Sequence, residues 1–207
     1  MKKILLQVLL GTATAIVLTG CISLSSPSNQ FSEHTDLQGS KIKHNIVYFA
    51  PEVYPDIEEI KFPSYQAFYN SISNKMSHYN QMRMTMIENF MAYDSVDEKI
   101  IKEVCENNNS DLAVVSQIKY FKVGIGKYVF SNQVLVSMKM FDSKGNLIKE
   151  SSYDTFKKNK RMIGSTENSI KIGTDGVMND ILKEIRQLNR QAELLYDETN
   201  KELIIGP

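Results

Sequence analysis

The stretch QVLVSMKMFDSKGNLI, Gln133–Ile148, carries a complete β-hairpin pattern and is the basis of the predicted fold. Its first half alternates apolar and polar residues with a period of two, the pattern of a strand with one buried face. The segment DSKGN then supplies turn residues, and a second run of strand-forming residues begins after it. We therefore predict a β-hairpin of strands 133–141 and 147–156. Its first strand places on one face Val134, Val136, Met138 and Met140.

A third strand is predicted just before this hairpin. The stretch DLAVVSQIKYFKV at 111–123 alternates with the same period. Gly124 and Gly126 follow it and indicate a flexible connection into the next strand. Three consecutive strands therefore share one apolar face, to which this stretch contributes Leu112, Val114, Ile118 and Tyr120.

A strand and a helix are predicted at the start of the folded part. The run NIVYFA at 45–50 is rich in β-branched and aromatic residues, and Pro51 ends it. After Pro63, a helix is predicted to begin with Ser64 as its N-cap and to end near Asn80. Its apolar positions are Tyr65, Phe68, Tyr69, Ile72 and Met76.

A second strand and helix follow directly. Residues 81–91 carry methionines at alternate positions, which predicts a half-buried strand. Ser95 and Glu98 form the capping-box pattern of a helix start, and the run Asn107–Ser110 ends that helix. Its apolar positions are Ile100, Ile101, Val104 and Cys105.

The last helix is predicted after a polar loop, with Thr174 and Asp175 as its cap. The final stretch, Leu194–Ile205, is predicted to form a hairpin around Glu198–Asn200. The element order βαβαβββα predicts an α/β (α+β) fold, in which a mixed sheet of about five strands carries three helices. The apolar positions of the last helix are Val177, Met178, Ile181, Leu182, Ile185 and Leu188.

The amino terminus has the anatomy of a secretion signal. Lys2 and Lys3 precede an apolar run at 4–18, which is shorter than the roughly 20 residues of a membrane-spanning helix. The residues LTGC at 18–21 resemble the bacterial lipobox. The resemblance implies that residues 1–20 are cleaved and that Cys21 carries acyl chains. The alternative is an ordinary secretory signal with an incidental cysteine.

A lipid anchor predicts a location. Ile22 stands where an Asp would retain an enteric lipoprotein in the inner membrane. The lipobox resemblance therefore implies the outer membrane, with the protein facing the periplasm; the outer leaflet of the inner membrane is the alternative. Residues 21–41, rich in Ser, Asn and Gln, are predicted to form a flexible tether, and residues 42–207 a single domain.

Composition adds two limits. Removal of Lys2 and Lys3 leaves 24 − 2 = 22 basic against 24 acidic residues, a net charge of −2. This balance lacks the basic excess that is typical of nucleic-acid binding. With Cys21 acylated, Cys105 has no cysteine to pair with inside the chain, and its place on an apolar helical face predicts a buried thiol.

Three features of the folded part match a known class of domain. They are the helix at 96–106 leading into Asp111–Ser116, the hairpin with its Asp142–Leu147 turn, and the last amphipathic helix. Together they resemble the amino-terminal domain of the Tol-Pal translocation protein, the curli-secretion lipoprotein and the lipoprotein activators of penicillin-binding proteins. The resemblance implies an accessory domain that binds another envelope protein, and it allows a homo-oligomer because some members form rings. It transfers no binding residue to this chain.

The sequence carries no recognised catalytic or cofactor motif. His34, His44 and His78 are too far apart for metal-ligand or dyad spacing, and nucleophile-elbow and phosphate-loop motifs are missing. We therefore predict a non-enzymatic adaptor without a cofactor, which binds a periplasmic protein. A hydrolase with a site assembled from scattered residues is a further hypothesis.

The methionines of the second strand allow two interpretations. Met82, Met84 and Met86 share one strand face, and their soft thioethers suit Cu(I), which would make the protein a metal or ligand carrier. The same face must also be buried for a sheet to pack, and flexible thioethers fill core gaps well. We favour the core and keep the carrier as the alternative.

Two further groups are weighed in the same way. The aromatic residues Tyr65, Phe68 and Tyr69 are predicted to be core or core edge, because they follow helical spacing, and otherwise a partner-binding surface. The basic cluster Lys157–Arg161 is predicted to be a solvated loop, and otherwise a contact for anionic lipid or polymer.

Overall fold

The computed structural model describes residues 43–79, 82–125, 128–159 and 165–204. Within them, six strands form one mixed sheet with four helices, so the predicted α/β fold is confirmed. The predicted signal peptide and tether lie outside the described residues. The elements are β1 (His44–Ala50), β2 (Glu52–Tyr54), α2 (Glu58–Met76), β3 (Met82–Phe90), α3 (Glu98–Asn107), β4 (Leu112–Ile125), β5 (Tyr128–Asp142), β6 (Leu147–Asp154), α4 (Thr155–Asn159) and α5 (Thr166–Ile204).

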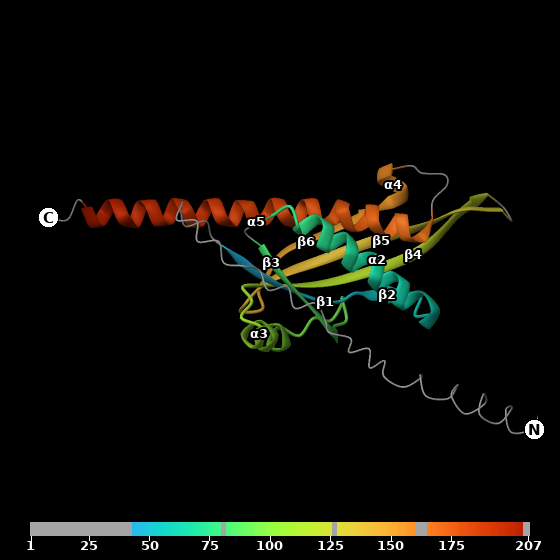
Figure 1. Ribbon diagram of the computed structural model, residues 1–207, viewed down its shortest axis with the longest axis horizontal. Coiled ribbons are helices and arrows are strands. Elements are labelled where there is room, and N and C mark those ends of the chain that lie inside the picture. Colours follow the sequence, from blue (N-terminus) through green and yellow to red (C-terminus); the bar gives the residue numbers. More distant parts are fainter. Residues whose placement is uncertain (1–42, 80–81, 126–127, 160–164, 205–207) are drawn as a thin grey trace, which may run out of the picture. The chain divides into compact units, whose positions relative to one another are not determined.

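The strands follow the order β3-β1-β4-β5-β6, with β2 beside β4 (Figure 1). β1 runs parallel to both of its neighbours, whereas β4, β5 and β6 form an antiparallel meander. β2 extends the line of β1 along β4, where Val53 pairs with Ile118. The two edges of the path are therefore β3 and β6.

The alternating residues of the strands divide between two faces, as the sequence predicts. α2 and α5 pack on one face, where Leu112, Val114 and Ile118 of β4 are buried. α3 packs on the other face, against Ala113 and Val115. Figure 1 shows α5 and α2 on one side of the sheet and α3 on the opposite side. The same burial on the α2–α5 face is confirmed for Val134, Val136, Met138 and Met140 of β5.

The turn between β5 and β6 forms at the predicted place. The Asp142 Oδ1 atom accepts hydrogen bonds from the backbone N–H groups of Lys144 (2.9 Å) and Asn146 (2.8 Å). Gly145 has φ +92°, a left-handed conformation that glycine adopts without steric cost. The turn lies close to α3, because a Cβ at this glycine would be 2.8 Å from the Glu98 carbonyl oxygen.

The predicted start and end of α2 are wrong. α2 begins at Glu58, so Pro63 and Ser64 lie inside the helix, and α2 ends at Met76 instead of near Asn80, which lies outside the described residues. Proline removes one helix hydrogen bond, a local loss that the packing of the rest of α2 outweighs. The Ser64 hydroxyl donates to the Ile60 carbonyl instead of capping.

The start of α3 differs by two residues from the predicted cap. Asp97 is the N-cap, and its carboxylate accepts a hydrogen bond of 2.9 Å from the Lys99 N–H, a role that the sequence pattern gave to Ser95. Aspartate and serine cap helices about equally well, so the pattern alone does not choose between them. The helix ends where the asparagine run predicts.

The carboxy-terminal region departs most from the predictions. The predicted polar loop contains α4 and the first turns of α5, which begins at Thr166 and passes through Thr174 instead of starting there. The predicted hairpin at Leu194–Ile205 is wrong, because α5 continues to Ile204. One 39-residue helix thus replaces a loop, a shorter helix and a hairpin.

Two glycines explain how α5 approaches the sheet so closely. A Cβ at Gly173 would lie 2.6 Å from Val136 Cγ2, and one at Gly176 would lie 2.1 Å from Tyr153 Cδ2. Glycine in a helix interior costs about 1 kcal/mol relative to alanine. The packing that these glycines permit offsets that cost, which propensity alone does not reveal.

We expect Gly176→Ala to lower the free energy of unfolding by about 1–3 kcal/mol, because the added methyl overlaps the Tyr153 ring. Urea unfolding of the non-acylated mature chain measures the change. Asn179→Ala, at an exposed position of the same helix, is the control and should be neutral or slightly stabilising. An equally stabilising Gly176→Ala would contradict the close contact.

Candidate functional site

A groove lies between α2 and the first turns of α5. It contains a hollow of about 350 Å³, which continues into an adjoining hollow of about 280 Å³. Its floor is formed by three buried residues, Ala67 and Ser71 of α2 and Ile170 of α5. The first two have small side chains. Larger residues at 67 and 71 would fill this space.

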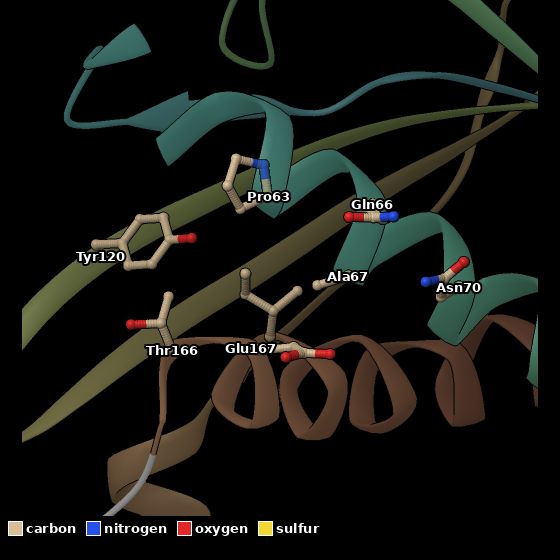
Figure 2. A pocket seen from close by; sticks show the side chains of 8 residues that line it. Pro63, Gln66, Ala67, Asn70, Tyr120, Thr166 and Glu167 are labelled. Carbon is tan, nitrogen blue, oxygen red and sulfur yellow. The ribbon is translucent and has the colours of Figure 1, made fainter. Parts of the chain in front are cut away.

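The walls of the groove are polar and exposed. α2 contributes Gln66, Asn70 and Asn74, which follow one another at intervals of four residues and so form one line along the helix. α5 contributes Glu167 and Lys171, again four residues apart. Figure 2 shows the Gln66 and Asn70 side chains on α2 above the α5 turn that carries Glu167.

Tyr120 of β4 closes one end of the groove. Its hydroxyl shares a hydrogen bond of 2.5 Å with Ser64 Oγ, and burial raises the pKa of the phenol. Figure 2 shows the hydroxyl directed toward the hollow, between Pro63 and Thr166. The tyrosine therefore stays neutral at physiological pH. Because the Ser64 proton goes to Ile60, the Tyr120 proton goes to Ser64 Oγ, and the Tyr120 oxygen can accept a further hydrogen bond.

The second half of α5 forms an arm, which we define as residues 190–204. The helix is buried up to Ile185 and half-buried at Leu188, but Leu194 and Leu195 of the arm are 59% and 64% exposed. Figure 1 shows this half of the helix continuing beyond the sheet. At 1.5 Å per residue the arm is about 22 Å long.

The chain enters the domain beside the base of the arm. His44 Nε2 at the start of β1 lies 2.5 Å from Asn189 Oδ1. β1 therefore begins where α5 leaves the sheet.

Other exposed apolar side chains are spread over several elements. On edge strand β3, Met86 is 43% and Phe90 58% exposed. Near the start of α2, Ile57 is 44% and Phe62 73% exposed. Single exposed apolar residues of this kind are common on protein surfaces and do not by themselves indicate a binding site.

A polar network lies on the sheet face that carries α3. Glu52 Oε2 accepts hydrogen bonds from the Tyr93 N–H (3.0 Å) and Gln117 Nε2 (3.1 Å). Lys139 Nζ donates to the Tyr93 carbonyl and lies 4.4 Å from the centre of its ring. The Tyr93 hydroxyl donates to Glu150, and burial, followed by this carboxylate, raises its pKa. Each group has a partner, so the network holds the segment after β3 against the sheet.

The sequence-predicted methionine group is only partly buried. Met82 and Met84 pack against the core beneath α2 and α5, whereas Met86 is exposed. No three His, Cys, Asp or Glu side chains of the described ranges lie close enough to hold a metal ion. The Cu(I) hypothesis, which uses thioethers, stays a prediction.

The other sequence-predicted groups fall as follows. Phe68 is fully buried and Tyr65 and Tyr69 pack against the core, so their assignment to core and core edge is confirmed. Lys157 and Lys158 are exposed, and Lys160 and Arg161 of the basic cluster lie outside the described residues. Cys21 also lies outside them. None of the described helices is both long and apolar enough to cross a bilayer.

Sequence reasoning missed the groove for a specific reason. The interval of four between Gln66, Asn70 and Asn74 is visible in the sequence, and it could have indicated a polar line on one helix. The opposite wall could not be found, because residues 166–171 were expected in a loop. Two segments about 100 residues apart must be helical and adjacent before the groove exists.

Comparisons with known proteins give similarities of backbone arrangement only. No protein-family model and no curated protein matches the chain. The PelC dodecamer from Paraburkholderia phytofirmans is 9% identical, with 66% of this chain and 85% of that chain covered and a TM-score of 0.42. The hypothetical protein CT253 from Chlamydia trachomatis is 11% identical, with 69% and 95% covered and a TM-score of 0.42. Lipoprotein GNA1162 from Neisseria meningitidis is 12% identical, with 68% and 99% covered and a TM-score of 0.39.

Cys105 gives a test of the α3 packing. Burial, with smaller effects from Asp142 and Asp111, raises the pKa of this thiol to about 11. At pH 8 roughly one molecule in a thousand would carry the reactive thiolate, so we expect labelling by iodoacetamide to be at least about tenfold slower in the native chain than in urea. The measurement uses the Cys21→Ser chain, in which Cys105 is the single thiol. Equal rates would show that the α3 face with Cys105 is not packed against the sheet.

Proposed function

We propose that the chain is a lipid-anchored envelope protein, which binds a periplasmic protein and acts as an adaptor instead of catalysing a reaction. The exposed arm is the observation that carries this proposal. A helix with two adjacent exposed leucines gains stability when these side chains are covered, by about 1.5–3 kcal/mol for each leucine that becomes fully buried. Docking of a helix into a groove of a partner is a common way to cover such a surface.

The position of the arm fits an anchored protein. The lipobox-like sequence attaches Cys21 to the membrane, and residues 21–41 span at most roughly 70 Å when extended. Because His44 lies beside Asn189, this tether would join the domain at the base of the arm. The anchor therefore keeps the domain, and with it the arm, within reach of a partner in the same membrane.

The arm is a better candidate interface than the sheet edge. β3 pairs with β1 on one side, and its other side is an open edge. Its register with β1 is interrupted by a bulge, because Met86 pairs with Tyr48 and Phe90 with Ala50, so that β3 has two more residues than β1 in this interval. Bulges of this kind hinder the pairing of an edge strand with a strand of another chain. We assign the protein interface to α5 and place the protein at the periplasmic face of the outer membrane, with the inner membrane as the alternative.

The anchor is tested by fractionating cells that make the full-length chain or its Cys21→Ser variant. We expect the natural chain in the outer-membrane fraction and the variant in the soluble periplasmic fraction, because acylation supplies the anchor. A variant that stays with the membrane would contradict lipidation at Cys21 as the means of attachment.

The arm is tested by Leu194→Gln/Leu195→Gln in the full-length chain. Both side chains are exposed, so stability should change by less than about 0.5 kcal/mol. We expect the double variant to lose a reproducible set of crosslinked envelope proteins that the natural chain captures. Lys183→Gln, at an exposed position of the same helix, should retain the set. Capture that is unchanged by the double variant would exclude the arm as the interface.

A further inference from the structure

We propose that the groove between α2 and α5 binds an extended peptide segment, in which the line of amides on α2 pairs with the peptide backbone. This surface is separate from the arm, and the proposal does not depend on the adaptor function. From residue 168 in the groove to Asn189 at the base of the arm, α5 covers about 30 Å. The two surfaces therefore contact different parts of a partner or different partners.

The spacing of the amides matches an extended chain. Gln66, Asn70 and Asn74 are four helical residues apart, a step of about 6 Å. An extended peptide repeats every two residues, about 6.6 Å, and presents an N–H and a C=O toward the same side at each repeat. Each side-chain amide offers both a donor and an acceptor, so each can satisfy one such pair. The three amides together cover about 12 Å, or roughly four peptide residues.

These amides are available for binding. The side-chain amides of Gln66, Asn70 and Asn74 are exposed, and they make no hydrogen bond with any of the described residues. Some amides elsewhere in the domain serve local structure, as where the Asn108 side chain donates to Val104 and that of Asn146 to Asp142. The α2 line instead offers hydrogen-bonding capacity that the fold does not use, and it does so beside a groove.

The opposite wall indicates which peptide side chains fit. Glu167 and Lys171 are exposed and form no ion pair within the described ranges. Their separation is again about 6 Å, the distance between alternate residues of an extended peptide. Glu167 would contact a basic side chain of the peptide, and Lys171 would contact an acidic side chain two residues away. The peptide residue between these two faces the floor at Ala67 and Ser71, where only a small side chain fits.

The regular spacing of the polar groups on both walls also favours a peptide over a carbohydrate. Sugar hydroxyls pair with amides as readily as peptide groups do, because they too donate and accept. A row of donor–acceptor groups at one fixed interval, faced by a carboxylate and an ammonium at the same interval, matches a peptide in both backbone and side chains. Carbohydrate binding is therefore one of the outcomes that the test distinguishes.

The test uses the full mature chain with Cys21→Ser, titrated with the peptides Ac-Ala-Lys-Ala-Glu-Ala-NH2 and Ac-Ala-Glu-Ala-Lys-Ala-NH2 while amide resonances are followed by NMR. The two sequences cover both directions of binding. We expect saturable shifts at Gln66, Asn70 and Asn74 and in the first turns of α5 for at least one peptide. Asn70→Leu should weaken binding about tenfold, because peptide groups lose their partner. Asn179→Leu, at an exposed α5 position outside the groove, is the matched control and should bind normally.

A second comparison isolates the backbone contacts. The same peptide with N-methyl groups at alternate residues keeps its side chains and loses the donors, and it should not bind. Charge reversal by Glu167→Lys should transfer binding to the peptide in which Glu replaces Lys. Binding that survives both N-methylation and Asn70→Leu would overturn the proposal. It would also be overturned if no peptide shifts the groove resonances up to millimolar concentration, or if tetra-N-acetylglucosamine shifts them and the peptides do not.

Discussion

The packing of α5 against β5, β6 and α2 is the contact on which the rest of the structure depends. Val177, Met178, Ile181, Leu182 and Ile185 are fully buried there, and each such side chain contributes about 1.5–3 kcal/mol relative to exposure. Gly173 and Gly176 allow the helix to lie directly on the side chains of Val136 and Tyr153. Without this layer, α2 and the apolar face of the antiparallel meander would both be open to water. The core is thus organised around one helix, which joins the sheet to α2.

The same helix links the core to both proposed surfaces. Its first turns, with Glu167 and Lys171, form a wall of the groove, and its last turns form the arm. Between them lies the buried part, which fixes both surfaces to the sheet. Since His44 contacts Asn189, the start of the domain lies at the arm and not at the groove. The groove lies about 30 Å along α5 from that point.

The sequence predicts the sheet well and the helices less well, for a physical reason. Strand alternation is a local signal, so the buried faces of β4 and β5 and the Asp142–Gly145 turn were correctly predicted. The other strand ends were not, because β5 begins at Tyr128 instead of Gln133 and Gly124, expected in the connection, lies in β4. The starts of α2 and α5 were misplaced because Pro63 and Gly173 are local breakers, and long-range packing outweighs their cost. The predicted hairpin at Leu194–Ile205 failed because the helix continues without sheet contacts. The groove could not be predicted, since it requires Gln66 and Glu167 to meet across two helices. The lipid anchor at Cys21 rests on sequence alone and stays a proposal.

Hydrogen exchange along α5 in the full mature chain, without a partner, tests whether this helix is core at its centre and solvent-exposed at its end. We expect strong protection of the amides from Ile170 to Leu188, comparable to that of β4 and β5. Protection should fall steeply after Asn189, because an isolated helical end is only marginally stable in water. Strong protection that continues to Ile204 in the monomer would show that the arm is covered. Weak protection at Ile170–Leu188 would show that α5 does not hold the core together.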